Sequence, residues 1–126
     1  MIGQGHAYAL RLLAEDGDIR PVAAADRSEE AVERARQICG FEHVGDDAQA
    51  VIDHPDVEAV VIVTPTTTHD AFVRAALAAG KHVLCEKPLA RNLDEARRMA
   101  SAAGLVAMVD HEFRWQPERR HVKELL

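Results

Sequence analysis

The sequence predicts an α/β protein built on a Rossmann-type, doubly wound parallel sheet. Short apolar segments alternate along the chain with amphipathic helical segments, and glycine repeatedly follows the last helical turn. Hydrophobic residues make up 48% of the chain but aromatic residues only 4%, which favours helices packed on a sheet through small side chains. In such sheets ligands bind beyond the carboxyl ends of the strands, so the residues that follow each strand are the functional candidates.

The expected strands are short and apolar. The segment VEAVVIVT is apolar at consecutive positions and rich in β-branched residues, as is typical of a strand covered on both faces. Each of the other strand candidates likewise lies beside a segment with a helical pattern. The predicted strands are 19–26, 42–45, 57–64, 81–86 and 105–110.

The expected helices have recognisable ends. A first helix runs from His6 onward, and Ser28 caps a second helix that extends to Ile38. A third helix ends at Gly80, and a fourth begins at Asn92 and ends at Gly104. The inward-facing residues predicted for this fourth helix are Leu93, Ala96, Met99, Ala100 and Ala103.

Composition excludes several classes of protein. A length of 126 residues corresponds to one domain, and a net charge of −6 does not favour nucleic acid as a partner. The most apolar run, 57–63, is too short to span a bilayer, so no membrane partner is expected. Cys39 and Cys85 are expected to be free thiols in a reducing cytoplasm, and the seven histidines show no metal-ligand spacing, so no metal site is predicted.

Asp26 ends the first predicted strand, about 20 residues after Gly3. An acid at this place in a dinucleotide fold accepts hydrogen bonds from the adenosine ribose and repels a 2′-phosphate, which favours NAD slightly over NADP. Arg27 weakens that preference, because a guanidinium can hold a 2′-phosphate. The alternative is that Asp26 only begins the turn into the next helix.

Two further strand ends carry candidate groups. The segment Thr64–His69 follows the most regular predicted strand and offers hydroxyls and backbone amides to a cofactor, or it is an ordinary threonine-rich helix start. The segment Glu86-Lys87-Pro88 places a lysine where proline ends a strand. In a partly desolvated cleft such a lysine can hydrogen-bond a substrate hydroxyl whose proton must leave during oxidation; the alternative is a solvated surface turn.

Together these segments resemble a known family. HVLCEKPLARNLDEARRM, the upstream run VVIVTPTTTHDAFVRAALAAGK and the later VDHEFRWQP resemble the Gfo/Idh/MocA family of NAD(P)-dependent oxidoreductases over essentially the whole chain. The acid–lysine–proline motif in this setting is the most specific part of the resemblance.

The resemblance implies a role for each matching position. Lys87 would be the catalytic lysine near the nicotinamide and the substrate hydroxyl, and Glu86 would lie beside the nicotinamide ribose. Asp26 would bind the adenosine ribose, with Arg27 beside it as a further cofactor-binding residue, while Thr64, Pro65 and His69 would line the cofactor groove. Arg114 would lie near a domain junction, and Trp115 would pack against the cofactor, the hinge or a domain interface. Glu112 stands where many members have Asn, so a polar contact by that position is in doubt.

The first glycines suggest that part of the family pattern is absent. Members of the family begin with a strand followed by G-x-G-x-x-G, and Gly3 best matches the third glycine, which allows close packing of helix on strand. The alternative, Gly3 and Gly5 as the first two, requires a small residue where Tyr8 stands. We therefore expect the first, central strand and the C-terminal sheet domain to be lacking. Residues 1–117 would form a partial NAD(P)-binding domain, and residues 118–126 would begin the connection to a substrate domain.

The sequence thus predicts an oxidoreductase fragment that has little activity alone. The parent enzyme would transfer hydride between NAD or NADP and a hydroxyl or carbonyl carbon of a sugar, cyclitol or related polyol, and would be a homo-oligomer. The alternatives are a non-catalytic nucleotide-binding module, a partner-dependent half-enzyme, and a truncated gene product without function.

Overall fold

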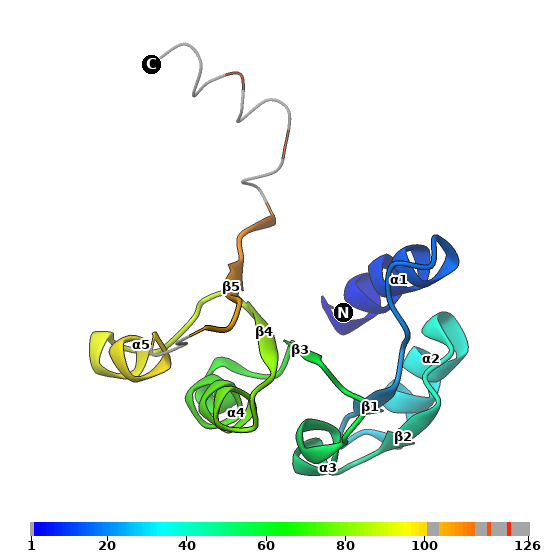
Figure 1. Ribbon diagram of the computed structural model, residues 1–126, viewed down its shortest axis with the longest axis horizontal. Helices are drawn as coiled ribbons and strands as arrows, with labels where there is room; N and C mark the ends of the chain where they lie inside the picture. The colour runs from blue at the N-terminus through cyan, green and yellow to red at the C-terminus, as the bar shows by residue number, and fades with distance from the viewer. Residues whose placement is uncertain (1, 101–103, 113–115, 117–120, 122–126) are drawn as a thin grey trace.

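The computed structural model describes residues 2–100, 104–112, 116 and 121. Helices and parallel strands alternate along the chain, as the sequence predicts (Figure 1). In chain order the elements are α1 (Ile2–Glu15), β1 (Ala23–Ala25), α2 (Glu29–Cys39), β2 (His43–Gly45), α3 (Ala48–Asp53), β3 (Ala59–Ile62), α4 (Thr66–Ala78), β4 (His82–Glu86), α5 (Leu93–Met99) and β5 (Ala107–Asp110).

The strands form two parallel sheets rather than one. β1 pairs with β2, and β3, β4 and β5 form a three-stranded sheet in that order. Among the described residues, β1 and β3 do not pair with each other and no strand lies hydrogen-bonded between them, so the sheet is interrupted at this point. This is the position at which the sequence predicts unpaired edges, because the central strand of the family pattern would lie there.

The main core lies between the three-stranded sheet and the helices on one of its faces. α4 packs on β3 and β4, and α5 packs beside α4 (Figure 1). Ala76 is completely buried, and its small side chain lets the α4 backbone approach the sheet closely. α1 and α2 pack against each other near the two-stranded sheet. The buried residues of the main cluster are Ile52, Ile62, Val73, Ala76, Val83, Cys85 and Met99.

Local signals place most helix ends correctly. The Ser28 side chain accepts a hydrogen bond from the Ala31 amide, and the Asn92 side chain accepts one from the Glu95 amide, which confirms both predicted N-caps. After α4, Gly80 adopts a left-handed conformation with φ 75°, and the following Lys81 amide donates to the carbonyl of Ala76.

Several sequence-based expectations need correction. The first strand covers three residues rather than eight, and the six-residue helix α3 was not predicted. α5 ends at Met99; Leu93 is 62% exposed and Ala100 is also exposed, so both inward assignments were wrong, whereas Met99 is buried. Ala103 lies outside the described residues.

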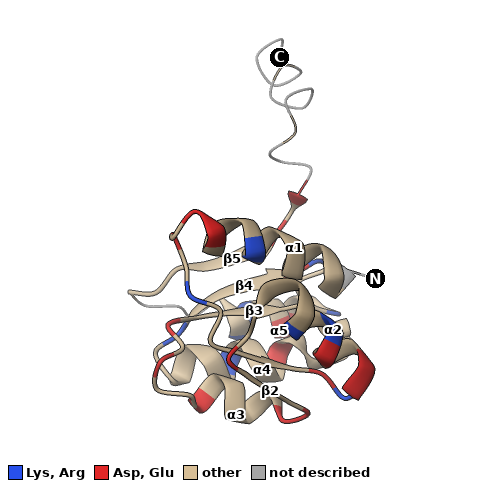
Figure 2. Ribbon diagram, turned by 90° about the vertical axis from the view of Figure 1, so that its right-hand side faces the viewer, with Lys and Arg blue, Asp and Glu red and all other residues tan. Residues whose placement is uncertain are grey.

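The surface is of mixed charge. On the side shown in Figure 2, basic and acidic positions are interspersed along the helices of the described chain. Many of these residues pair within one helix, as Arg34 does with Glu30 and Arg74 with Asp70. No helix among the described residues is long and apolar enough to cross a membrane.

Two glycine-to-alanine substitutions are predicted to shift stability in opposite directions. Gly80→Ala should lower the free energy of unfolding by about 1 kcal/mol, because a side chain disfavours the left-handed conformation at this position. Gly5→Ala should raise it by up to about 1 kcal/mol, because Gly5 lies inside α1 and an added Cβ meets nothing within 4 Å. Urea unfolding of both variants measures the difference, and equal shifts would contradict these assignments.

Candidate functional site

The candidate groups gather where the parallel strands end. Glu86 is the last residue of β4 and Asp110 the last residue of β5, and the two are partners in the sheet register. Thr64 follows β3 by two residues, and Asp26 follows β1 directly. Because the strands of each sheet are parallel, their carboxyl ends lie at the same edge of that sheet, where open α/β sheets bind ligands.

Glu86 is a buried carboxylate with a partner on each oxygen. Its side chain is enclosed, with 7% of the residue exposed. Oε1 accepts a hydrogen bond from Nε2 of His6 at 3.0 Å, and Oε2 accepts one from the backbone amide of Lys87 at 2.9 Å. Burial by itself would raise the pKa of Glu86, but these hydrogen bonds and the charge of Lys87 outweigh it and hold the pKa below its usual value.

Asp110 faces the same histidine. Its Oδ2 lies 3.4 Å from Nε2 of His6, so one ring nitrogen lies against two carboxylates. The ligand-type atoms of His6, Glu86 and Asp110 all lie within 4.8 Å of one another. The sequence pattern did not identify this cluster, because its members come from α1, β4 and β5 and meet only through the register of β4 with β5.

Lys87 lies between two carboxylates at the site edge. Its Nζ is 3.8 Å from Oε2 of Glu86 and 3.5 Å from Oε1 of Glu112, and 38% of its side chain is exposed. The Lys87–Pro88 peptide bond is cis. Glu112, for which the sequence left a polar contact in doubt, therefore contacts the candidate catalytic lysine. The lysine is near the surface and can meet a small molecule at this edge.

His69 connects two of the strand-end turns. It is 1% exposed; Nε2 lies 2.8 Å from the Thr64 carbonyl, and Nδ1 lies 3.1 Å from the Pro88 carbonyl. Thr64 also accepts a hydrogen bond through its hydroxyl from the hydroxyl of Thr68 at 2.8 Å. His69 thus holds the turn after β3 against the turn that follows Lys87, with both ring nitrogens directed at backbone oxygens.

The turn after β1 is more open. Asp26 is exposed, and its Oδ1 accepts a hydrogen bond from the backbone amide of Ser28 at 2.8 Å. This contact fits the turn that the sequence offered as the alternative interpretation, and it involves only one of the two carboxylate oxygens. Arg27 is also exposed beside it.

Other predicted positions are less central or lie outside the structure. Gly3 is in the first turn of α1, and an added Cβ there would lie 3.7 Å from Cγ2 of Val63, an ordinary van der Waals distance. Close helix–strand packing at Gly3 therefore accommodates alanine. Pro65 is the residue before α4 and is exposed. Arg114 and Trp115 lie outside the described residues.

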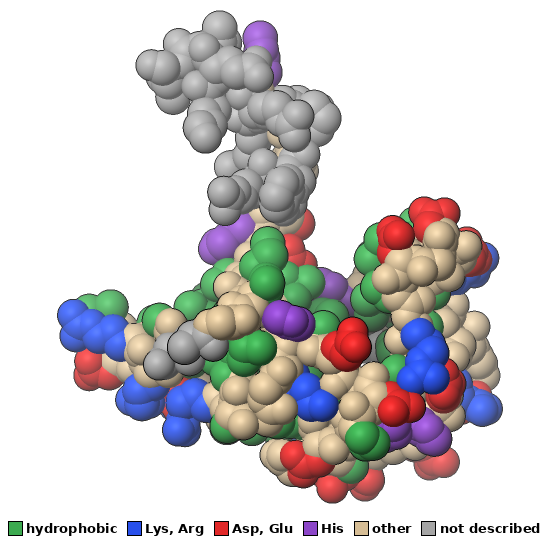
Figure 3. Space-filling model, viewed as in Figure 1, with side chains coloured by type: hydrophobic (Ala, Val, Ile, Leu, Met, Phe, Trp, Pro, Cys, Tyr) green, Lys and Arg blue, Asp and Glu red, His purple; other side chains and the backbone are tan. Residues whose placement is uncertain are grey.

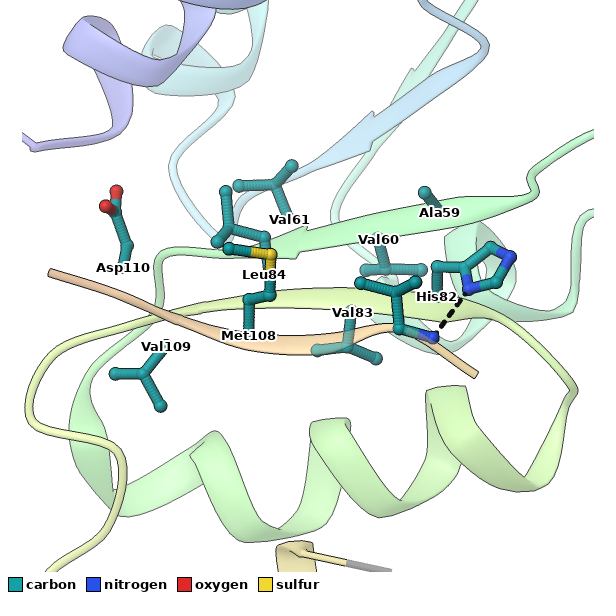
Figure 4. A pocket seen from close by; sticks show the side chains of 10 residues that line it. Ala59, Val60, Val61, His82, Val83, Leu84, Met108, Val109 and Asp110 are labelled. Carbon is teal, nitrogen blue, oxygen red and sulfur yellow. Dashed lines mark hydrogen bonds between the residues drawn. The ribbon is translucent and has the colours of Figure 1, made fainter. Parts of the chain in front are cut away.

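The sheet face that carries Glu86 and Asp110 is hollowed. An apolar hollow of ≈ 340 Å³ runs along β3, β4 and β5 and reaches Asp110. Figure 4 shows Val61, Leu84 and Met108 side by side on this face, whereas Val109 points toward α4. Figure 3 shows the surface indented between α1 and the end of β5. His6 of α1 contacts Asp110, so α1 adjoins the hollow where β5 ends.

The fold and the strand-end groups define a dinucleotide-binding α/β domain of the oxidoreductase class. Parallel strands, an acid directly after β1 and an acid–lysine–proline segment at the end of β4 occur together in this chain. The chain belongs to the GFO_IDH_MocA oxidoreductase family with an NAD-binding Rossmann fold, whose sequence model matches residues 1–111.

Several curated relatives are named as dehydrogenases of sugars or cyclitols. The chain is 41% identical over 102 residues to levoglucosan dehydrogenase of Pseudarthrobacter phenanthrenivorans, which covers 79% of this chain and 26% of the relative. It is 36% identical over 98 residues to myo-inositol 2-dehydrogenase of Thermotoga maritima, covering 78% of this chain and 28% of the relative. The chain therefore spans about a quarter of the length of these relatives.

Solved structures share the fold. Scyllo-inositol dehydrogenase from Lactobacillus casei, with bound NAD(H) and scyllo-inositol, matches with a TM-score of 0.83 and 27% identity over 97% of this chain and 37% of its own. A variant of a 3-ketoreductase from Actinomadura kijaniata, in complex with TDP-benzene and NADP, matches with a TM-score of 0.82 and 32% identity over 94% of this chain and 37% of its own. The family and the first of these structures support a nicotinamide dinucleotide as the cofactor.

The lowered pKa of Glu86 predicts a pH-dependent contribution to stability. Ionised Glu86 stabilises the folded state fully above about pH 5, and this contribution is lost as the pH falls through the lowered pKa. Glu86→Gln should therefore be less stable than the wild type at neutral pH by about 2 kcal/mol, the scale of hydrogen bonds to a charged group, with a smaller difference in acid.

Urea unfolding across a pH series measures this difference. Glu58→Gln, at an exposed carboxylate before β3, is the matched control and should follow the wild type at every pH. A Glu86→Gln deficit that is equally large in acid and at neutral pH would show that ionisation of Glu86 does not stabilise the fold.

Proposed function

We propose that this chain supplies the NAD(P)-binding part of an oxidoreductase that transfers hydride between the cofactor and a hydroxyl or carbonyl carbon of a sugar, cyclitol or related polyol. The observation that carries the proposal is Lys87 at the carboxyl end of β4, held between Glu86 and Glu112. The relatives that act on levoglucosan and inositol support a polyol as the substrate class.

Lys87 is proposed as the catalytic residue. When bound, the nicotinamide supplies the hydride acceptor or donor. Alcohol oxidation also releases the hydroxyl proton, and a neutral lysine amine within hydrogen-bond reach can accept it. In the reverse direction the ammonium form donates that proton to the carbonyl oxygen. The neighbouring carboxylates of Glu86 and Glu112 orient Nζ toward the edge where the strands end.

The other strand-end residues are proposed to bind the cofactor. Asp26 fits the adenosine ribose because it is exposed and a single backbone contact involves only one of its oxygens. Arg27 lies beside it, which leaves NADP open, although Asp26 favours NAD slightly. Gly3, Thr64 and Pro65 would line the groove, and Glu86 would lie beside the nicotinamide ribose.

His69 is proposed to act indirectly. Its ring is buried and directed at the carbonyls of Thr64 and Pro88, so it would shape the cofactor groove by holding these two turns together. A ring placed in this way contributes through the backbone rather than through a contact of its own with the cofactor.

The wider organisation is also a proposal. Residues 1–117 would form the nucleotide-binding domain, and residues 118–126 would begin the connection to a substrate domain, with Arg114 and Trp115 near the junction. The buried free thiols of Cys39 and Cys85 support a cytoplasmic location, and burial together with the Glu86 charge raises the pKa of Cys85 to about 11. We also propose that the whole enzyme is a homo-oligomer.

A second candidate is a nucleotide-binding module without turnover, or a half-enzyme that needs a partner. The matched segment spans only 26% of levoglucosan dehydrogenase, so the relatives' substrate contacts need not lie within it. Turnover of a polyol by the purified chain would argue against this second candidate. Cofactor binding without turnover is compatible with both candidates and is the result that we expect for the chain alone.

Calorimetric titration of the chain with NADH and NADPH tests the proposed function. We expect both to bind, NADH more tightly. Asp26→Ala should lower the ratio of the NADPH to the NADH dissociation constant by roughly tenfold, because it removes a ribose acceptor and the repulsion of the 2′-phosphate.

Asp18→Ala, at an exposed aspartate after α1, is the matched control and should leave the ratio unchanged. If neither dinucleotide binds the wild-type chain, the proposed function is wrong. If both bind but Asp26→Ala leaves the ratio unaltered, Asp26 is not the ribose acid.

A further inference from the structure

α1 crosses the end of the three-stranded sheet at one particular row of residues. Val63 follows β3, Glu86 ends β4 and Asp110 ends β5, and the register carries this row across the sheet. A Cβ added at Gly3 would lie 3.7 Å from Cγ2 of Val63, and His6, one helical turn later, reaches Glu86 and Asp110. The first two turns of α1 therefore cover the whole row.

The register creates an electrostatic conflict that this contact resolves. Side chains alternate between the faces of a strand, so Glu86 and Asp110, as register partners, point to the same face. Two carboxylates on neighbouring strands repel each other, and the repulsion is stronger where the groups are partly removed from water. Glu86 is buried, and Asp110 is half-buried. A donor shared between them offsets this repulsion.

The ring nitrogen of His6 is that donor. Carboxylate oxygens only accept hydrogen bonds, so Nε2, at 3.0 Å from Glu86 and 3.4 Å from Asp110, must carry a hydrogen. With this hydrogen directed at the carboxylate oxygens, Nε2 forms a hydrogen-bonded bridge between Glu86 and Asp110. The shorter contact goes to Glu86, the carboxylate that also receives the Lys87 amide.

We infer that His6 is a positioning residue for Lys87: it fixes the Glu86 carboxylate from α1, and Glu86 in turn fixes the backbone and the side chain of Lys87. The two oxygens of Glu86 have different partners. Oε1 contacts His6, and Oε2 contacts the backbone amide and the ammonium group of Lys87. The step from Lys87 to chemistry rests on the proposed function; the link from His6 to Glu86 does not.

The bridge makes two substitutions act on Glu86 in opposite directions. His6→Leu removes the donor and leaves two carboxylates facing each other, so the pKa of Glu86 should rise. Asp110→Asn removes the like charge while His6 remains, so the pKa of Glu86 should fall. His6→Gln keeps an N–H donor and should stay close to the wild type. His43→Leu, at an exposed histidine in β2, is the matched control.

The test uses the 126-residue chain with two measurements. Carbon-13 NMR of the glutamate side-chain carboxyls follows the titration of Glu86, and calorimetry gives the NADH dissociation constant. For His6→Leu we expect an upward shift of the Glu86 pKa and roughly tenfold weaker NADH binding, because a hydrogen bond to a charged group is lost. For His6→Gln we expect the Glu86 titration to stay close to that of the wild type and the NADH dissociation constant to change by no more than about twofold.

Several results would overturn the inference. A Glu86 titration unchanged in both His6→Leu and Asp110→Asn would show that the bridge does not set the state of Glu86. Equal loss of NADH binding in His6→Leu and His6→Gln would show a packing role for the ring instead. If His6→Leu does not fold, Asp110→Asn still tests the link. If the wild-type chain binds no dinucleotide, the proposed function fails, while the Glu86 titrations still decide the role of His6.

Discussion

The structure depends on one buried carboxylate. Glu86 lies where β4, β5 and α1 converge, and both of its oxygens are engaged, by His6 on one side and by the Lys87 amide on the other. A buried charge without partners is costly, so the elements that supply these partners are constrained relative to one another. The strand end, the following turn with Lys87 and the start of α1 are therefore held as one unit, and the candidate chemistry is located there.

The same contact compensates for the interruption of the sheet. β1 and β3 do not pair with each other, so no backbone ladder connects the two sheets among the described residues. α1 packs on α2 beside the two-stranded sheet and contacts the three-stranded sheet through Gly3 and His6. α3, which contacts both β1 and α4 and buries Ile52 in the main core, connects the two parts as well. The relative placement of Asp26 and Lys87, which lie on opposite sides of the interruption, therefore depends on both helices.

Much of the fold was predictable because it is encoded locally. Runs of β-branched residues such as 60–63 predict strands, and Ser28, Asn92 and Gly80 mark helix ends through their own side chains or backbone. The predicted strand length and helix orientation were wrong where tertiary contacts determine them: β1 is shorter than its apolar run, and Leu93 of α5 is exposed. α3 has only six residues, too few for a clear helical period.

In the candidate site, too, some residues could be proposed from local sequence, whereas others are revealed only by tertiary contacts. Asp26, Thr64 and Lys87 could be proposed from the sequence because each lies at or just after the end of a predicted strand. His6 and Asp110 were not assigned roles, because their meeting depends on the β4–β5 register and on the path of α1. The buried position of His69 was not predicted, because one of its partners is the carbonyl of Pro88 in a turn 19 residues away, which no local pattern reveals.

Residue-resolved NMR of the chain during addition of NADH tests the central claim most directly. If the strand ends form a dinucleotide site, amide shift changes will concentrate at Asp26 to Ser28, at Thr64 to Thr68 and at Glu86 and Lys87. Changes that are absent from these segments, or that concentrate instead on the outer faces of α4 and α5 around Arg74 and Arg98, would contradict the account.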